Sequence, residues 1–135
     1  MSMSVVWAAL AYIIPTFPLG YFWHLTTFKE RYAALNIYRP DVIPALGLTS
    51  MIIQGVIFGI IYVSMFAPMD AGWLTKGLTY AALGGFLSWS FTTVAAVAKS
   101  PMTSLRDFFV IETAFTAIQW IVVGVVTALA VGWLT

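Results

Sequence analysis

The chain is 135 residues long, and 61% of its residues are hydrophobic while 8% are charged. Because so few charged side chains cannot cover the surface of a water-soluble domain, the composition predicts an integral membrane protein. The chain has no cysteine, which excludes a disulfide, a thiol nucleophile and a thiolate-bound metal, and its net charge of +1 is too small to indicate a nucleic-acid partner.

Four stretches of the chain lack Asp, Glu, Lys and Arg and contain 22 or more residues each. About 20 residues of helix cross the hydrocarbon core of a membrane. We therefore expect an all-α membrane protein that forms a single domain of four transmembrane helices, at about residues 4–28, 42–67, 74–98 and 107–134. The first stretch lacks the basic leading segment of a signal peptide, so it should remain in the protein.

Basic residues in the loops predict how the chain lies in the membrane. The first and third loops carry five of the six basic residues, and the second loop carries only Lys76. Because basic loops stay in the cytoplasm, we expect loops one and three to face the cytoplasm and both termini to lie outside. Trp7, Trp73 and Trp133 lie near the expected outer ends of helices, which agrees with the preference of indoles for the membrane interface.

The first helix ends in a short motif that recurs in the third. Trp23 to Thr27 reads WHLTT, and Trp89 to Thr93 reads WSFTT, 66 residues later. The helices that follow also match, because each contains Ile-Gln with a glycine five residues after the Gln. We therefore expect two similar helical hairpins related as a parallel repeat, and chance similarity between apolar segments is the alternative.

Polar side chains near the middle of the helices predict contacts between helices. Gln54 and Gln119 both lie about 18 to 20 Å from the ends that carry the basic loops, and Ser88 and Ser90 reach a similar depth. A buried amide needs a partner in a membrane, and a Gln–Gln or Gln–Ser contact is worth about 0.6 to 2 kcal/mol. We expect these four residues to hold the helices together, with a role in transport as the alternative.

Glu112 and His24 are the ionisable residues inside the predicted helices that have no ionisable counterpart in the other hairpin. Both lie about 7 Å inside the nearest charged loop residue, so they share a depth and could meet. Glu112, Thr116 and Gln119 follow spacings of four and then three residues. This spacing places them on one face of the fourth helix, which must point into the bundle rather than at lipid.

Two interpretations of Glu112 and His24 stay open. In the first, they form a proton or cation site, because a charged carboxylate inside a membrane is costly and is typically retained for function. In the second, Glu112 reaches Arg106, Lys99 or interfacial water, and His24 bonds near a helix end. One His and one Glu are too few ligands for zinc or for a haem with two His ligands, so we expect no metal or cofactor.

The first loop is long enough for a short helix at the membrane surface. Tyr32 and Tyr38 would lie at the level of the lipid headgroups, and Arg31 and Arg39 would face anionic lipid. Together with Lys99 of the third loop, these arginines form the expected surface for lipid headgroups or for a docking partner.

The segment PLGYFWHLTTFKERY, from Pro18 to Tyr32, contains Gly-x-x-Trp followed by a Phe and a Tyr at the end of the first helix. It resembles uncharacterised small proteins of the bacterial inner membrane that are grouped in domain-of-unknown-function families. The resemblance implies a four-span protein of the bacterial inner membrane. It implies no catalytic or binding residue.

Two functions fit these expectations. The first is a non-catalytic membrane subunit or helper that packs against itself or a larger assembly, with sensitivity to bulky side chains at Gly55, Gly59 or Gly85. The alternative is a small oligomeric transporter or channel that couples protons or cations through Glu112 and His24. The sequence has no Ser/His/Asp set, no phosphate-binding glycine loop and no paired carboxylates on one helix, so we do not expect an enzyme.

Overall fold

The computed structural model describes all 135 residues and contains helices and no strands. Four helical segments are long and apolar enough to cross a membrane, at Met3–Thr27, Pro44–Phe66, Trp73–Lys99 and Leu105–Leu134. The predicted all-α membrane fold with four spanning helices is therefore confirmed.

The first two spans each end in a π-helical turn. α1 (Met3–Phe22) continues into η1 (Trp23–Thr27), and α3 (Pro44–Ile61) continues into η2 (Tyr62–Phe66). A π turn contains an extra residue, because its backbone hydrogen bonds reach five residues back instead of four. In η1, the Phe28 N–H donates to the Trp23 carbonyl at 3.1 Å.

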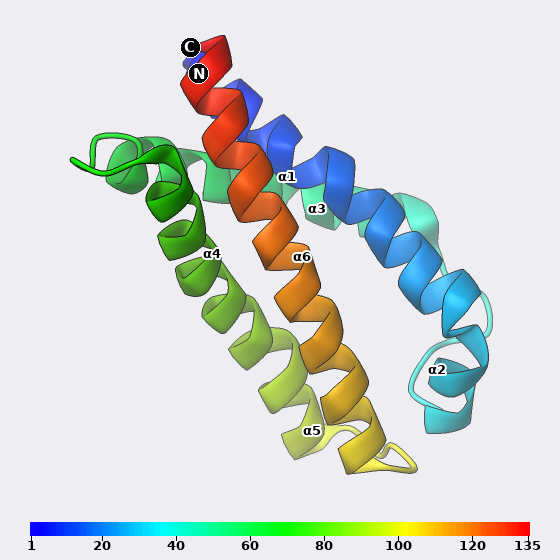
Figure 1. Cartoon of the computed structure of the whole chain (residues 1–135). Coiled ribbons are helices and arrows are strands. Elements are labelled where there is room, and N and C mark those ends of the chain that lie inside the picture. Colours follow the sequence, from blue (N-terminus) through cyan, green and yellow to red (C-terminus); the bar gives the residue numbers. More distant parts are fainter.

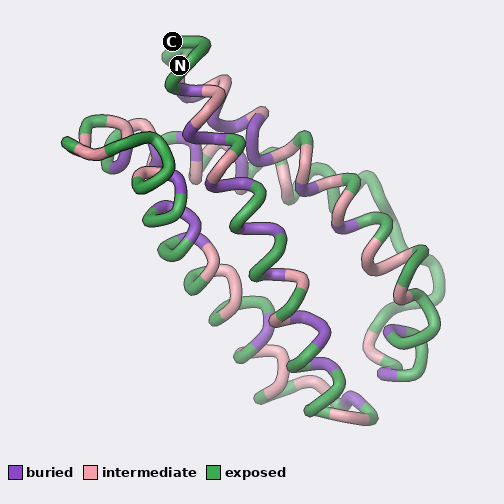
Figure 2. Tube along the Cα trace, in the orientation of Figure 1, coloured by how far each residue is buried: buried purple, intermediate pink, exposed green.

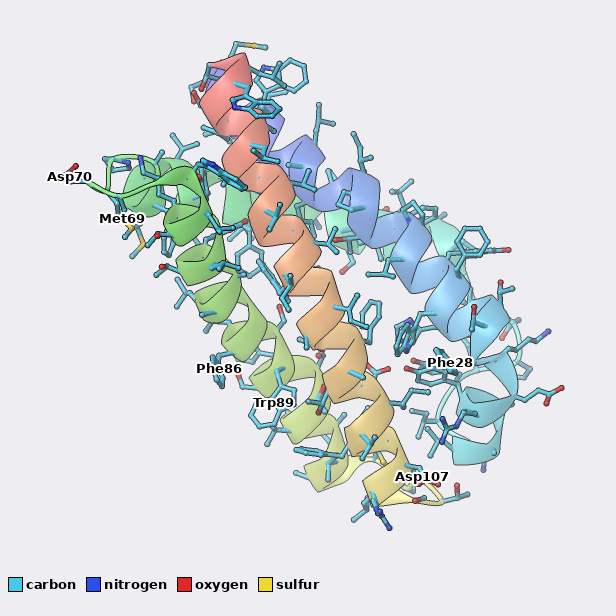
Figure 3. The ribbon with its side chains drawn as sticks, in the orientation of Figure 1. Phe28, Met69, Asp70, Phe86, Trp89 and Asp107 are labelled. Atoms are coloured by element: carbon cyan, nitrogen blue, oxygen red, sulfur yellow. The ribbon has the colours of Figure 1, made fainter.

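The second pair of spans differs in regularity. α4 (Trp73–Trp89) passes through a third π turn, η3 (Ser90–Val94), into α5 (Ala95–Lys99), whereas α6 (Leu105–Leu134) is α-helical throughout. The loop between the first two spans contains the expected short helix, α2 (Lys29–Leu35). Both chain termini lie at the end of the molecule opposite α2 (Figure 1), and these two ends are called the terminal end and the α2 end below. Asp70 and Asp107 lie toward these opposite ends (Figure 3).

The four spans form an open arc rather than a closed bundle (Figure 1). α1 and α6 pack together, α3 packs on α1 and α4 packs on α6. Near the terminal end, Phe58 of α3 also reaches Trp120 of α6 and Tyr80 of α4. In the most apolar stretch of each span, 39% of the residues of the first span and 44% of those of α6 are buried, against 17% in the spans that contain α3 and α4. Figure 2 shows this difference in burial. α4 touches the second span at η2, whereas α3 and α4 themselves diverge toward the α2 end.

Glycines bring the backbones of neighbouring helices into direct contact. A Cβ atom on Gly59 would lie 3.0 Å from the carbonyl oxygen of Val5, and one on Gly77 would lie 2.6 Å from that of Gly124. α3 therefore packs on α1, and α4 on α6, without room for a side chain between them. The small-residue faces of the outer helices are thus used inside the chain.

The expected tight contact at Gly85 is wrong by one residue. A Cβ atom on Gly84 would lie 2.1 Å from the indole of Trp120, whereas one on Gly85 would have its nearest neighbour 3.4 Å away. The Trp120 side chain is 1% exposed, so the indole has little space into which it could move. The tight position of α4 is therefore Gly84.

The α2 end is closed by a small apolar cluster that joins α2 to α6 and to the loop before it. The cluster consists of Tyr32, Leu35, Met102, Phe108 and Ile111. Thr103 adds two hydrogen bonds, from its N–H to the Leu35 carbonyl at 3.2 Å and from its hydroxyl to the Ala34 carbonyl at 2.7 Å. α2 is therefore fixed against the third loop and the start of α6.

The two halves of the chain share local features and differ in their surroundings. The segment WHLTT forms η1 and the segment WSFTT overlaps η3, so both copies of the motif contain a π turn. α1 packs on α3 as α4 packs on α6, but the extensive contact between α1 and α6 has only a small counterpart between α3 and α4, where the rings of Phe58 and Tyr80 lie 6.4 Å apart. The duplication of a parallel hairpin stays a prediction.

We predict different effects of one substitution at two neighbouring glycines. Gly84→Ala displaces the Trp120 indole and should destabilise the protein by about 1 to 3 kcal/mol. Gly85→Ala places its Cβ atom at an ordinary contact distance and should be neutral or stabilise by up to about 1 kcal/mol, because glycine is a poor helix former. Reversible unfolding in mixed detergent micelles measures both values, and equal losses in the two variants would contradict the packing of Trp120.

Candidate functional site

His24 and Glu112 meet between the first span and α6, near the α2 end. Nε2 of His24 lies 2.8 Å from Oε1 of Glu112, although the two residues are 88 positions apart in the chain. Glu112 is buried and His24 is partly buried. The direct contact of the first interpretation is present, and Glu112 makes no ion pair with Arg106 or Lys99. His24 also bonds to the Gly20 carbonyl near the end of α1, as in the second interpretation, and a role of the pair as a proton or cation site stays a prediction.

The hydrogen bonds of the pair define where its protons lie. Nδ1 of His24 lies 2.9 Å from the carbonyl oxygen of Gly20, and since a carbonyl can only accept, Nδ1 carries a hydrogen. Nε2 of His24 and Oε1 of Glu112 then share one further proton. The pair is either imidazolium with carboxylate or imidazole with carboxylic acid, and both forms have zero net charge. The contact between the two side chains therefore depends on one shared proton.

The π turn η1 carries His24 at the end of the first span. The hydrogen bond from Phe28 to Trp23 closes this turn, and the ring of His24 folds back onto the carbonyl of Gly20. The ring packs edge-on against Phe115 of α6, with ring centres 4.5 Å apart. An extra residue in a helix changes the direction of the side chains around it, and π turns are frequent at functional sites.

The expected position of Tyr32 at the lipid headgroups is wrong, because its side chain points inward and is 1% exposed. The Tyr32 hydroxyl donates to Oε1 of Glu112 at 2.5 Å and accepts from Nε1 of Trp23 at 3.0 Å. Tyr38 stacks on the Tyr32 ring, with ring centres 5.3 Å apart. α2 therefore completes the site with a hydroxyl group that sequence reasoning assigned to the membrane surface.

Both tyrosines stay protonated at neutral pH. Burial raises the pKa of Tyr32, and its hydrogen bond to Glu112 and the charge of Glu112 raise it further, while the N–H of Trp23 lowers it. Burial and the charge of Glu112 likewise raise the pKa of Tyr38. Tyr32 is therefore a permanent hydrogen-bond donor to Glu112.

Gln54 and Gln119 are linked through a tyrosine in the middle of the molecule. The Tyr12 hydroxyl donates to Oε1 of Gln54 at 2.6 Å and accepts from Nε2 of Gln119 at 3.5 Å. Nε2 of Gln119 also approaches the Thr16 hydroxyl at 3.5 Å, and Gln54 donates to the Ser50 hydroxyl at 2.8 Å. The two amides thus join α3, α1 and α6 indirectly, with no Gln–Gln contact.

The expected contacts of Ser88 and Ser90 with the amides do not form. The Ser88 hydroxyl accepts from Nε1 of Trp120 at 3.0 Å, so Ser88 joins α4 to α6. Ser90 is exposed, and its hydroxyl donates to the carbonyl of Leu87 in its own helix at 3.0 Å. The reason is geometric, because Trp120 reaches Ser88 and the face of Ser90 points away from the other helices.

Arg31, Arg39 and Lys99 are all exposed at the α2 end. Arg39 forms two hydrogen bonds with Asp41, at 2.9 and 3.1 Å, and its guanidinium lowers the pKa of the Asp41 carboxyl. Arg31 and Lys99 make no ion pair within the chain. A lipid headgroup or docking surface formed by these three residues stays a prediction.

A cavity of about 670 Å³ opens between the outer helices and reaches the His24–Glu112 pair. Residues of α1, α3, α4, η3 and α6 line it, and its polar wall includes Tyr12, Thr16, Gln54, Glu112, Thr116 and Gln119. The stripe from Glu112 to Gln119 extends about 10 Å along α6, as expected from 1.5 Å per residue. The pair and the amides linked by Tyr12 therefore belong to one continuous site.

The donor set of the site restricts what it could hold. His24 and Glu112 offer two ligands, and no third His, Cys, Asp or Glu side chain lies close enough to complete a metal site. A structural zinc ion takes four such ligands and a catalytic zinc ion takes three. His24 and Glu112 are therefore too few to hold a zinc ion by themselves.

Comparison with protein-family models, with curated proteins and with solved structures finds no match for this chain. The resemblance of the Pro18–Tyr32 segment to small bacterial inner-membrane proteins stays a prediction.

Removing the Tyr32 hydroxyl should weaken the fold at the site. Tyr32→Phe takes a donor from a buried carboxylate and an acceptor from Trp23, so we expect a loss of about 1.5 to 3 kcal/mol of unfolding free energy. Tyr38→Phe is the matched control, because Tyr38 contacts the site through its ring. Unfolding in mixed detergent micelles measures both variants, and a Tyr38→Phe loss as large as that of Tyr32→Phe would contradict the assigned hydrogen bonds.

The raised pKa of Tyr32 also predicts a loss of stability in alkali. Below the ordinary pKa of 10.0, Tyr32 keeps its proton in both the folded and the unfolded chain, so it adds no pH dependence to the stability there. Above it, the unfolded chain ionises while the folded chain does not, so stability falls as pH rises. Circular dichroism between about pH 9 and 11 should show a shallower fall for Tyr32→Phe than for wild type. Parallel curves would contradict the prediction.

Proposed function

We propose that this chain is a small transporter of the bacterial inner membrane that exchanges a cation for the proton held by His24 and Glu112. Its α2 end, which carries most of the basic residues, faces the cytoplasm, and both termini lie outside. The observation that carries the proposal is the 2.8 Å contact between His24 and Glu112 on the wall of a cavity.

The proton controls whether the pair can stay in contact. With the shared proton, Nε2 of His24 and Oε1 of Glu112 attract each other across a hydrogen bond. Without it, a lone pair faces a negative oxygen at 2.8 Å, and one uncompensated negative charge stays inside the membrane. A cation that enters the cavity removes that cost. Proton loss and cation binding are therefore linked.

Few other charged or titratable groups lie near enough to the pair to change its charge balance. Tyr32 and Tyr38 approach the pair from α2 and the following segment, and both stay protonated. No Asp, Lys or Arg side chain from α3, α4 or α6 lines the cavity. The charge balance of the site therefore depends on His24, Glu112 and whatever occupies the cavity.

A non-catalytic membrane subunit or helper is the second candidate. It is supported by the exposed apolar sides of α3 and α4, which lipid, a second copy or a larger assembly would cover. It ranks second because the glycine faces that would serve a partner pack inside the chain instead. In both functions the chain is not an enzyme and uses no cofactor.

The test is proton release from sealed vesicles that contain the purified protein, an acidic interior and a trapped pH-sensitive dye. Na⁺, K⁺ and a series of organic amines are added outside in turn, at a constant membrane potential. We expect wild-type vesicles to release protons in response to at least one cation. Glu112→Gln should abolish the response, and Glu30→Gln, which changes an exposed carboxyl of α2, should leave it unchanged.

Equal responses of wild type and Glu112→Gln, or no response of wild type to any cation, would rule out the transport proposal. A larger protein recovered in fixed ratio with the chain from its native membrane would then favour the helper function.

A further inference from the structure

We propose that the exchanged cation is organic and lipophilic, and that it enters the cavity from the membrane between α3 and α4 to bind at Glu112 among aromatic rings. This inference rests on the proposed proton-linked transport and specifies the class of its substrate. Four features of the cavity support it: its charge, its aromatic wall, the position of its opening and its size.

The wall of the cavity favours positive charge. Glu112 is its only carboxylate, and no Lys or Arg side chain lines it. Oε1 of Glu112 is occupied by His24 and Tyr32, whereas Oε2 makes no hydrogen bond and is not fully enclosed. Oε2 is therefore the atom available to a positively charged ligand.

Aromatic rings lie beside the His24–Glu112 pair. The rings of Phe115 and Tyr32 lie nearest that of His24, with ring centres 4.5 and 4.7 Å away, and the ring of Tyr38 lies 6.2 Å away. The charge of Glu112 reaches Tyr38, because it contributes to the raised pKa of that phenol. Tyr21 and Phe91 continue the aromatic lining. One contact between a cation and a ring face strengthens binding by about twofold to thirtyfold, most where water is excluded.

The opening of the cavity lies on the side of the arc that would face lipid. Residues of both α3 and α4 line the cavity, and these two helices diverge toward the α2 end. Ile57 of α3 and Phe91 of η3 both line the cavity and are 52% and 73% exposed. Such an apolar rim admits molecules dissolved in the membrane. It offers no set of oxygen ligands to replace the water around an inorganic cation.

The size of the cavity fits a ligand larger than a single ion. Its volume of about 670 Å³ lies within the range of about 300 to 1,000 Å³ that holds drug-sized ligands. Gln54, Thr116 and Gln119 line the same cavity nearer the middle of the membrane. They can hydrogen-bond one polar substituent of a ligand whose charge lies at Glu112.

Charge balance requires a one-for-one exchange. The protonated His24–Glu112 pair is neutral, so a monovalent cation beside it would leave one positive charge inside the membrane. Loss of the shared proton leaves neutral His24 and negative Glu112, which neutralises the cation. One cation therefore enters as one proton leaves, and no covalent bond of the ligand changes.

Tetraphenylphosphonium is a suitable probe, and tetraphenylborate, which has a similar shape and the opposite charge, is its control. Equilibrium dialysis measures binding to the purified protein in a non-ionic detergent, with protein-free micelles as the baseline. A pH-sensitive dye in weak buffer measures proton release. We expect saturable binding of tetraphenylphosphonium and no saturable binding of tetraphenylborate. Binding should release a proton, and the affinity should fall by up to about tenfold for each unit decrease in pH.

Three variants test the roles of the carboxylate and of one aromatic ring, and provide a control outside the cavity. Glu112→Gln should abolish saturable binding and proton release. Phe115→Leu keeps the carboxylate and should weaken binding by about fivefold through loss of a ring contact. Phe86→Leu should bind as wild type does, because Phe86 lies on the outer side of α4 (Figure 3), 71% exposed and outside the cavity.

The outcomes distinguish this inference from the proposed function. Equal phosphonium binding by wild type and Glu112→Gln, or binding without proton release, would overturn the inference. No phosphonium binding, while Na⁺ or K⁺ still releases protons from vesicles, would overturn the substrate class and leave proton-linked transport in place. Failure of both experiments would overturn the two proposals together.

Discussion

A carboxylate inside a membrane must find its partners within the protein, and the arrangement of the α2 end follows from this requirement at Glu112. Oε1 of Glu112 receives His24 from the first span and the hydroxyl of Tyr32 from α2. These two bonds bring two segments of the first half of the chain onto α6. They also explain why α2, although exposed and charged on one side, packs inward against the third loop.

The open side of the molecule follows from how unevenly the helices pair. At Gly59 the backbone of α3 packs directly against that of α1, and at Gly77 the backbone of α4 packs directly against that of α6. α3 and α4 therefore approach each other only near η2, where the rings of Phe58 and Tyr80 lie 6.4 Å apart, and they diverge toward the α2 end. The space that results is bounded by the polar stripe of α6. The pairing of the outer with the central helices therefore determines both the packing of the chain and the position of the cavity.

The depth of a residue along its helix could be counted from the sequence, but the neighbouring helix that its side chain contacts could not. The rise of about 1.5 Å per residue put His24 and Glu112 at one level, and the helical period put Glu112, Thr116 and Gln119 on one face. Which residues meet depends on the rotation of neighbouring helices. Ser88 consequently bonds to Trp120 rather than to an amide, and Gly84 rather than Gly85 meets the indole.

By itself, the sequence determined the class of the protein, the number of spanning helices and the inward direction of the polar stripe, because composition and the period of one helix decide these. Only the tertiary structure decided that Tyr32 turns inward to Glu112, that Tyr12 joins the two amides and that the cavity opens between α3 and α4. Each of these depends on contacts between segments distant in the chain, and no local pattern of residues encodes which distant segments will touch.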